Sequence, residues 1–481
     1  MLWRGEMCRI TISFAPKAPG RQEAVLRVLS NDPEAPVLEI GLSGSGVPRP
    51  SKIGFFRGGS WDLDFNGNAA LDPCGIDQGF LSFGGLPGDV PLAGDWLKKA
   101  LEDMPVRIAI VHDYLNQMGG AERVVAVFHE MFPEAPIFTT LVDRSLLTPE
   151  LAAADIRPSW MQRLPGWRKH FKKYLLFYPK AIESLDLRGY DVVISSSSAF
   201  AKGAVKQEGA LHVCYCYTPM RFVWDYENYL ERERLPVAYQ KMLPFAIRRL
   251  RKWDLATRCR PDRYLAISSC VKERIGRIYG QEAKVIYPPV EVQRFERSAR
   301  GGDYYLVVSR LAAYKRLDLA VRAFNILGLP LKVIGSGPAG QSLKNQAGPN
   351  IEFRGRVSDG ELAAYYAGCK ALIFPGVEDF GLAPLEANAA GRPAIAFHGG
   401  GALDTIDPEV NGLFFREPSA ESLVAAVRLL ESAGVNFQSA RIREHAWKFD
   451  KSVFKEQFRQ YLTGLLGGKG ARDPDPAQLA L

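Results

Sequence analysis

Buried-strand and helix patterns alternate along most of the chain. Residues 106–111 (VRIAIV) form a continuous apolar run that suits a buried parallel strand. In the next stretch Val124, Val125 and Phe128 fall on one face of a helix. Further strand-like runs, separated by helical stretches, are APIFTTL, YDVVISSS, LHVCYCY, RYLAISS and KVIYPPV. This alternation predicts a doubly wound parallel sheet.

A second series of the same kind begins at residue 303. Its strand-like runs are DYYLVVSRL, LKVIGSGP, IEFRGRV, KALIFPGV and PAIAFHGG. Two α/β domains in tandem are therefore expected, at residues 104–298 and 299–450. Between the carboxyl ends of their strands they would enclose a cleft, which is where open α/β sheets bind ligands. A helix at 451–466 carries an apolar stripe, and 467–481 is predicted to be a disordered tail.

The first hundred residues have a different pattern, that of short β-strands joined by turns. CRITISF, AVLRVLS and VLEIGLSGSG predict three strands over residues 8–46. Residues 1–47 resemble the C-terminal half of an immunoglobulin-like domain of the ASH or choice-of-anchor type. The residues that carry this resemblance are Phe14, Pro16, Gly20, Ser30-Asn31-Asp32-Pro33 and Leu42-Ser43-Gly44. Three strands without their partner sheet cannot bury a complete core.

Residues 48–103 resemble one FG-GAP/VCBS-type repeat and a linker. Asp62, Asp64 and Asn66 have the i, i+2, i+4 spacing of a calcium loop, but the glutamate of an EF-hand is absent. The alternative is a hairpin turn at Asn66-Gly67. A rearranged gene, or translation that starts at Met104, is favoured over a purposeful fusion as the origin of the two fragments.

Composition and charge support this division. The 481 residues predict about three domains, and 47% hydrophobic with 24% charged residues is typical of globular proteins. Residues 1–103 carry 10 Lys/Arg and 13 Asp/Glu, whereas the remainder carries 51 and 40. No apolar run is long enough for a transmembrane helix, and the start is unlike a signal peptide. Seven cysteines without a CxxC pair favour reduced thiols in the cytosol.

The strongest chemical signal lies in EDFGLAPLEANAAG, where a loop enters a helix. Gly381 and Pro384 mark the start of that helix, whose free N–H groups suit a phosphate. Glu386 lies inside the helix, within reach of a ribose, and Glu378 lies on the loop before it. Two carboxylates beside an anion site are costly unless they bind hydroxyl groups, which indicates a sugar nucleotide.

Cations complement these carboxylates. Arg310 and Lys315 follow the strand YLVV and emerge at the carboxyl edge of the sheet. They can stabilise a diphosphate leaving group without a metal, and residues 104–466 contain no DxD-like metal cluster. In the first domain, Gly119 and Gly120 occupy a strand-to-helix loop that could face an anion. An ordinary tight turn is the alternative for that pair.

Residues 104–466 resemble a family 4 glycosyltransferase of the GT-B fold, in particular the mannosyltransferases that build O-antigen or exopolysaccharide chains. GT-B proteins have two Rossmann-like domains that face each other across a cleft. Here a short all-β extension precedes them. The matching stretches are HDYL…GGAERV, YCYTPMRFVWD, VIYPPVEVQRF, SRLAAYKRLDLAV, VIGSGP, EDFGLAPLEANAAGRPAIA and GGGALDTI.

The resemblance implies a retaining transferase that holds its donor mainly in the second domain and its acceptor in the first. The donor would be GDP-mannose or another nucleotide sugar, used without a cofactor or metal. The helix 451–466 would pack back on the first domain. The donor-binding residues implied are Gly120, Arg310, Lys315, Gly335, Gly337, Glu378, Phe380, Gly381, Leu382 and Glu386. Gly119 and Arg221 would lie on the acceptor side.

One departure from the family concerns catalysis. Many relatives have a histidine that faces the donor sugar, where this chain has Tyr217. Tyrosine can still donate a hydrogen bond, so Tyr217 joins Glu378, Arg310 and Lys315 as a candidate catalytic residue. Cys214 and Cys216 flank this segment and fit alternate positions on a buried strand better than a metal site.

A basic, aromatic-rich stretch suggests contact with a membrane. Residues 160–180 contain six Lys/Arg and no Asp/Glu, and residues 241–263 add eight Lys/Arg against two Asp. Such a stretch suits an anionic membrane surface, although a solvated basic face is the alternative. Nucleic acid is disfavoured because no recognition motif accompanies the charge. The protein is expected on the cytoplasmic side of the plasma membrane, bound peripherally, with a lipid-linked glycan as acceptor.

Three functional hypotheses remain open from the sequence. The leading one is transfer of a hexose, mannose from GDP-mannose, to a lipid-linked saccharide in cell-surface polysaccharide (lipopolysaccharide) biosynthesis. A sugar-nucleotide epimerase or a phosphorylase on the same fold is the first alternative. The second is an exported adhesive or structural protein that acts through the N-terminal β fragments. Acceptor-dependent release of a nucleoside diphosphate separates the first hypothesis from the others.

Overall fold

The computed structural model divides into two compact units, Met1–Pro91 and Leu92–Leu481. In the second unit it describes residues 106–225, 237–296, 302–432 and 437–467. In the first unit it describes the backbone of five strands, so the predicted turn and calcium loop around Asn66 and the predicted tail beyond residue 467 lie outside the described residues.

The strands of the first unit form two small sheets. β2 (Gly20–Leu29) pairs with β3 (Val37–Gly46) in an antiparallel hairpin. β1 (Ile10–Ile12) pairs in parallel with β5 (Ser60–Leu63), which is antiparallel to β4 (Phe55–Arg57). The sequence pattern predicted that β1 belongs with β2 and β3. In the structure β1 instead pairs with β5, which lies in the second predicted fragment, residues 48–103.

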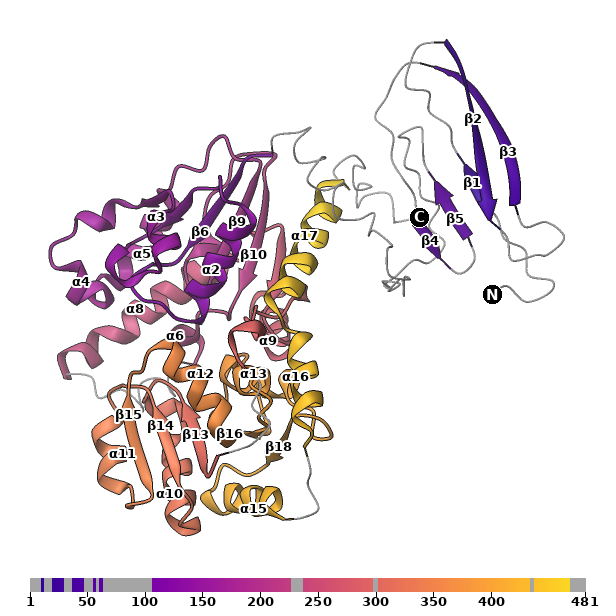
Figure 1. Ribbon diagram of the computed structural model, residues 1–481. Helices are drawn as coiled ribbons and strands as arrows, with labels where there is room; N and C mark the ends of the chain where they lie inside the picture. Colours follow the sequence, from indigo (N-terminus) through magenta and orange to yellow (C-terminus); the bar gives the residue numbers. More distant parts are fainter. Residues whose placement is uncertain are drawn as a thin grey trace, which may run out of the picture. The chain divides into compact units, whose positions relative to one another are not determined.

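The first α/β domain is built on a seven-stranded parallel sheet with strand order β12-β11-β10-β9-β6-β7-β8 (Figure 1). Its strands are β6 (Ile108–His112), β7 (Ile137–Thr139), β8 (Ile156–Pro158), β9 (Val192–Ser197), β10 (Leu211–Cys216), β11 (Arg263–Ala266) and β12 (Ala283–Val285). Its helices are α2 (Gly120–Met131), α3 (Pro149–Ala153), α4 (Trp167–His170), α5 (Tyr178–Glu183), α6 (Arg221–Trp224), α8 (Val237–Ala256) and α9 (Ser269–Tyr279).

Alternate residues of the central strands bury opposite faces of this sheet, as the pleat requires. Ile110 and Ile194 belong to one apolar cluster, whereas Val111 and Val193 belong to the other. Both faces are therefore covered, which explains why the strands read as continuous apolar runs.

The second α/β domain has a six-stranded parallel sheet with order β15-β14-β13-β16-β17-β18. Its strands are β13 (Tyr304–Val308), β14 (Leu331–Ile334), β15 (Ile351–Gly355), β16 (Cys369–Phe374), β17 (Ala394–Phe397) and β18 (Gly412–Phe415). Its helices are α10 (Leu317–Leu327), α11 (Gly340–Gln346), α12 (Asp359–Gly368), α13 (Leu382–Ala389), α14 (Ala402–Thr405), α15 (Ala420–Glu431) and α16 (Ser439–Trp447). The predicted fold class, two doubly wound α/β domains, is confirmed.

The strand order places the candidate site residues where each sheet reverses the direction in which the chain winds. In each sheet the chain winds outward in one direction and then returns, between β6 and β9 and between β13 and β16. Loops that follow such strands diverge and leave a crevice at the carboxyl edge. Gly119 follows β6, Arg310 and Lys315 follow β13, and Glu378 follows β16.

The last helix, α17 (Lys451–Gly467), returns to the first domain (Figure 1). The ring of Phe458 lies 4.8 Å from that of Phe128 on α2, and Lys455 Nζ lies 2.7 Å from a carboxylate oxygen of Glu130. Aromatic packing and ion pairs thus hold α17 on the first α/β domain. None of the helices among the described residues is long and apolar enough to cross a bilayer.

Candidate active site

An ion pair joins two loops of the second domain. Lys315 ends a short 3-10 turn after β13, and Glu378 lies on the loop between β16 and α13. The Lys315 Nζ is 2.5 Å from Glu378 Oε2, and the two side chains are 15% and 21% exposed. The pair is therefore largely shielded from water yet still partly exposed, and such shielding strengthens a charge contact with a ligand.

Three cations surround the ring of Tyr314 beside this pair. Arg310 donates a hydrogen bond of 2.8 Å to the Tyr314 hydroxyl and lies 5.6 Å from the ring centre. Lys315 and Arg221 lie 5.1 and 5.7 Å from the same ring. The electron-rich face of the ring favours cations around it. Arg221 comes from the first domain. The Tyr314 ring therefore contacts a candidate residue of the acceptor side as well as two candidate donor-binding residues.

The amino ends of α2 and α13 meet at the junction of the domains. Gly381, the residue before α13, has φ of 95°, and a Cβ there would lie 2.8 Å from the Phe374 ring. A Cβ on Gly120 would lie 3.1 Å from Leu382 Cδ1 across the junction. Both helix ends carry free N–H groups and partial positive charge. Together with Lys315, they make this junction suitable for an anion.

Glu386 already has protein partners at both oxygens. Arg123 of α2 donates to Oε1 at 3.1 Å, and the Tyr366 hydroxyl donates to Oε2 at 2.7 Å. The residue is 9% exposed. A carboxylate accepts more than one bond at each oxygen, so a ribose hydroxyl could share this group with Arg123 rather than displace it.

Several predicted donor residues shape the loops. Gly335 has φ of 130°, and a Cβ there would lie 1.9 Å from the Ser309 carbonyl oxygen. A Cβ on Gly337 would lie 2.4 Å from the Leu311 carbonyl oxygen. These glycines let the loop after β14 approach the loop after β13. The Phe380 side chain is buried, and its ring stacks 5.7 Å from that of Tyr287.

A buried polar network lies beneath the Gly119–Gly120 loop. The Tyr217 hydroxyl donates to the Ala121 carbonyl at 3.1 Å and lies 2.8 Å from Ser196 Oγ. His112 Nδ1 lies 3.0 Å from the same Ser196 oxygen. Its other ring nitrogen lies 3.9 Å from Glu122, which accepts the Gly119 N–H at 2.9 Å. The network links the residue that replaces the usual histidine to the backbone of the glycine loop.

The His112–Glu122 pair shifts both pKa values. Burial alone lowers the pKa of His112, but the hydrogen bond and charge of Glu122 outweigh it, so the pKa lies above the ordinary 6.5. Burial raises the pKa of Glu122, but the bonds and charge of His112 outweigh that effect and hold it below the ordinary 4.5. The folded protein therefore favours the charged form of both groups.

This pair is expected to stabilise the fold fully between pH 4.5 and 6.5. Above that window the unfolded chain releases the His112 proton first, so the stabilisation falls as pH rises through the folded-state pKa. Below it the unfolded chain binds the Glu122 proton first, so the stabilisation falls again. Thermal unfolding of the wild type and of His112→Gln should show a Tm difference that is largest inside the window. A Tm difference that does not change with pH would contradict the assignment.

Sequence patterns missed the contacts that cross between the domains. Arg274 on α9 donates to Asp379 Oδ1 at 2.6 Å, and Arg221 lies 3.7 Å from the other oxygen. Asp379 stands between Glu378 and Phe380, so its position in the motif could have drawn attention to it. Arg123 and Arg274 sit on ordinary amphipathic helices, where nothing in the local pattern separates them from solvated residues.

The calcium hypothesis for the N-terminal region stays a prediction. The loop positions Asp64 and Asn66, and the side chain of Asp62, lie outside the described residues. Cys214 and Cys216 are free thiols buried in β10. Within the described ranges, no group of three or more His, Cys, Asp or Glu side chains could hold a metal ion.

Comparison with known proteins identifies the class of this site. Residues 118–294 match the family model "Glycosyltransferase Family 4", and residues 291–448 match "Glycosyl transferases group 1". A crystal structure of HepE from Anabaena in complex with UDP-glucose has a TM-score of 0.57 at 15% identity, with 74% of this chain and 99% of that chain covered. The two α/β domains therefore have the GT-B fold, and each of them matches a glycosyltransferase family model.

Among curated relatives, mannosyltransferases are similar to part of the chain. A GDP-mannose-dependent alpha-(1-6)-phosphatidylinositol monomannoside mannosyltransferase of Mycobacterium tuberculosis is 30% identical over 218 residues, which is 39% of this chain and 56% of that protein. A GDP-mannose-dependent alpha-mannosyltransferase of Corynebacterium glutamicum is 35% identical over 107 residues, covering 22% of this chain and 26% of that protein. The chain thus spans about half the length of the first relative and less of the second. Residues 1–117 lie outside both family models.

Proposed function

We propose that this glycosyltransferase transfers mannose from GDP-mannose, with retention of configuration, to a lipid-linked saccharide. The similarity to two GDP-mannose-dependent enzymes supports the donor. The observation that carries the proposal is the Lys315–Glu378 pair, which lies on loops of one sheet edge beside the amino end of α13. It offers a cation for a diphosphate and a carboxylate for sugar hydroxyls.

The proposal gives each group a role. Lys315 and Arg310 stabilise the charge that grows on the diphosphate as the glycosidic bond breaks, so the transfer needs no metal or other cofactor. The free N–H groups of Gly381 and Leu382 add to this stabilisation. Glu378 binds the donor sugar hydroxyls, and Glu386 accepts from the ribose. Gly335 and Gly337 bring their loop close enough to bound nucleotide for backbone contacts.

The first domain closes the site from the other side. The acceptor hydroxyl attacks the face that the nucleotide leaves, and the departing phosphate takes its proton. Gly120 approaches the diphosphate, and Arg221 lies on the acceptor side with Gly119. Tyr217 acts through the carbonyl of Ala121, which it holds in place. Positioning of the two substrates then supplies much of the rate.

A sugar-nucleotide panel tests the proposal directly. The purified chain is incubated with GDP-mannose and other sugar nucleotides, with and without a membrane-lipid extract, and the released nucleotide is measured. GDP release that depends on both GDP-mannose and the extract supports the proposal. An epimerase would convert the sugar nucleotide without releasing GDP, and a phosphorylase would need inorganic phosphate. The absence of nucleoside diphosphate release from every combination would refute transfer.

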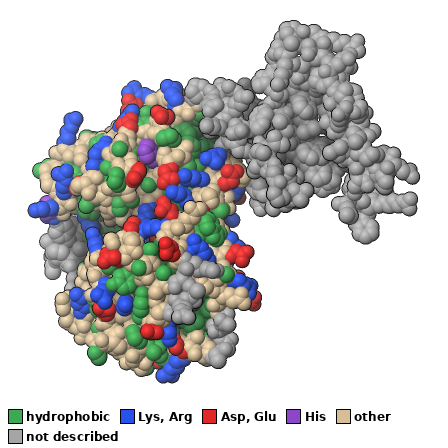
Figure 2. All heavy atoms as spheres, viewed as in Figure 1, with side chains coloured by type: hydrophobic (Ala, Val, Ile, Leu, Met, Phe, Trp, Pro, Cys, Tyr) green, Lys and Arg blue, Asp and Glu red, His purple; other side chains and the backbone are tan. Residues whose placement is uncertain are grey.

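We also propose that the protein binds the cytoplasmic face of the plasma membrane through a surface on the first domain. This aromatic–basic surface consists of Trp160, Leu176, Phe177, Lys172 and Lys173. The three apolar side chains are 37%, 38% and 47% exposed, and the Trp160 and Phe177 rings lie 6.0 Å apart. Elsewhere, on the face viewed in Figure 2, basic and acidic side chains are interspersed. The aromatic–basic surface is therefore better evidence for membrane binding than the overall net charge is.

Replacing Lys172 and Lys173 with alanine should weaken binding to anionic vesicles roughly 30-fold, because each lysine contributes about 1 kcal/mol near such a surface. Sedimentation with phosphatidylglycerol-containing vesicles measures this, and neutral phosphatidylcholine vesicles should bind poorly. Lys344→Ala on the second domain serves as the control, since its side chain is exposed and remote in sequence from the surface. Equal binding of the double variant and the control would refute this surface.

A further inference from the structure

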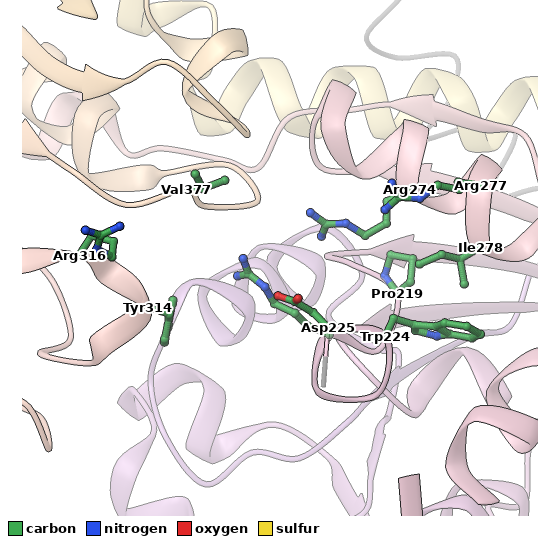
Figure 3. A pocket seen from close by; sticks show the side chains of 10 residues that line it. Pro219, Trp224, Asp225, Arg274, Arg277, Ile278, Tyr314, Arg316 and Val377 are labelled. Carbon is green, nitrogen blue, oxygen red and sulfur yellow. The ribbon is translucent and has the colours of Figure 1, made fainter. Parts of the chain in front are cut away.

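A cavity of about 590 Å³ lies between the two domains, lined by both of them (Figure 3). Arg221 and Trp224 come from α6, and Arg274 and Arg277 come from α9 of the first domain. Residues from the loop after β13, among them Tyr314 and Arg316, line it from the second domain. The cavity thus opens beside Lys315, next to the proposed donor site, and can hold a saccharide-sized ligand.

The lining is strongly cationic. It contains four arginines and a single carboxylate, that of Asp225. Arg274 is paired with Asp379 at 2.6 Å and Arg316 with Asp318 at 3.2 Å, so these two hold the walls in place. Arg221 lies farther from Asp379, at 3.7 Å, and is 35% exposed. Arg277 is exposed. Among the described residues no carboxylate pairs with its guanidinium.

Hydrogen bonds hold the two aromatic side chains of the cavity, Trp224 and Tyr314, in place. The Trp224 indole N–H donates to Asp254 Oδ2 at 2.7 Å. Asp254 is fully buried and pairs with Lys202 at 3.1 Å. On the opposite wall, the Tyr314 hydroxyl accepts from Arg310. A rigid aromatic wall and a free guanidinium can bind the apolar face of a sugar and an anionic group on it.

We propose that this cavity binds the acceptor, and that it selects acceptors that carry a phosphate or pyrophosphate ester. The inference rests on the proposed function and names the acceptor class of that site. Guanidinium groups bind phosphate oxygens in a bidentate manner that a neutral saccharide cannot use. Arg277 and Arg221 take the phosphate, Trp224 contacts the sugar, and Tyr314 separates this group from the donor diphosphate.

Two probes that both carry a phosphate ester test whether the acceptor is a soluble sugar phosphate or a membrane lipid. N-acetylglucosamine 1-phosphate represents a soluble sugar phosphate, and a short-chain lipid pyrophosphoryl N-acetylglucosamine represents a membrane lipid. Octyl mannoside is the neutral comparison. Binding is measured by calorimetry on the full chain saturated with GDP, so that the donor site is filled. Either phosphorylated probe should bind at least tenfold more tightly than the neutral one. Equal binding of all three would overturn the inference.

Arg277→Gln should then raise the dissociation constant of the phosphorylated probe roughly 10- to 100-fold, the scale of one charge-assisted contact. In turnover it should raise the KM for the acceptor and leave GDP affinity unchanged. Lys272→Gln, on the exposed side of the same helix, is the matched control and should change neither. If Arg277→Gln weakens GDP instead of the probe, the cavity belongs to the donor and the inference fails.

These outcomes separate the inference from the proposed function. Loss of phosphorylated-probe binding in Arg277→Gln supports the cavity even if no sugar nucleotide is turned over. Conversely, acceptor-dependent GDP release with unchanged kinetics in Arg277→Gln supports the transferase and refutes the phosphate-selective cavity.

Discussion

Lys315→Ala is expected to slow glycosyl transfer by roughly 10²–10³, the scale of losing one preorganised charge contact with a developing anion. Its ammonium group lies 2.5 Å from Glu378 and is largely shielded from water. Because the diphosphate gains charge as the bond breaks, the loss should fall on kcat more than on the KM for the donor. Steady-state rates with varied GDP-mannose measure this division.

Two comparisons make that result specific. Lys344→Ala removes an exposed lysine of the same domain and should leave kcat unchanged. Arg310→Ala should slow transfer by a similar roughly 10²–10³, and it also removes the donor to the Tyr314 hydroxyl. Wild-type rates in both Lys315→Ala and Arg310→Ala would refute the diphosphate site, whatever the acceptor proves to be.

Lys202→Met is expected to destabilise the first domain by about 3–5 kcal/mol, because it leaves a buried carboxylate without its cation. The Lys202 and Asp254 side chains are 1% and 0% exposed. The ammonium group also donates to Thr257 Oγ1 at 2.7 Å and to the Asp254 carbonyl at 2.9 Å. Urea unfolding followed by circular dichroism measures the loss.

The double variant Lys202→Met/Asp254→Asn should recover part of that stability, since it removes the uncompensated charge. Arg188→Met is the control for an exposed ion pair, because the Arg188 side chain is 84% exposed, and it should leave the stability close to that of the wild type. A loss in Lys202→Met no larger than the control's would mean that Asp254 is not charged in the fold.

Much of the fold could be predicted from the sequence, but the pairing within the site could not. The apolar runs at Val106–Val111 and Tyr304–Val308 identified central strands, because residues close in the chain decide whether both faces of a strand are buried. Lys315 stood out because it follows such a strand, and Glu378 because it lies on the loop that enters the helix with Glu386. Arg123 did not, since a charged residue on a surface helix has no local feature that marks a partner 263 residues away.

The N-terminal region shows the same limit at the level of strands. Alternation predicted β1, β2 and β3, yet the hydrogen-bonded partner of β1 is β5 rather than the adjacent hairpin. Period-two patterns specify that a strand exists and which face is apolar, but not which neighbour supplies its hydrogen bonds.

By itself, the sequence determined two parallel α/β sheets and a set of charged residues at their carboxyl edges, because strand burial and helix periodicity depend on near neighbours in the chain. Only the tertiary structure decided that Lys315 pairs with Glu378, that Arg123 reaches Glu386, and that four arginines line one cavity between the domains. The Lys315–Glu378 pair arises where two loops of one sheet meet, and the other contacts arise where the two α/β domains pack against each other, so their partners lie far apart in the chain.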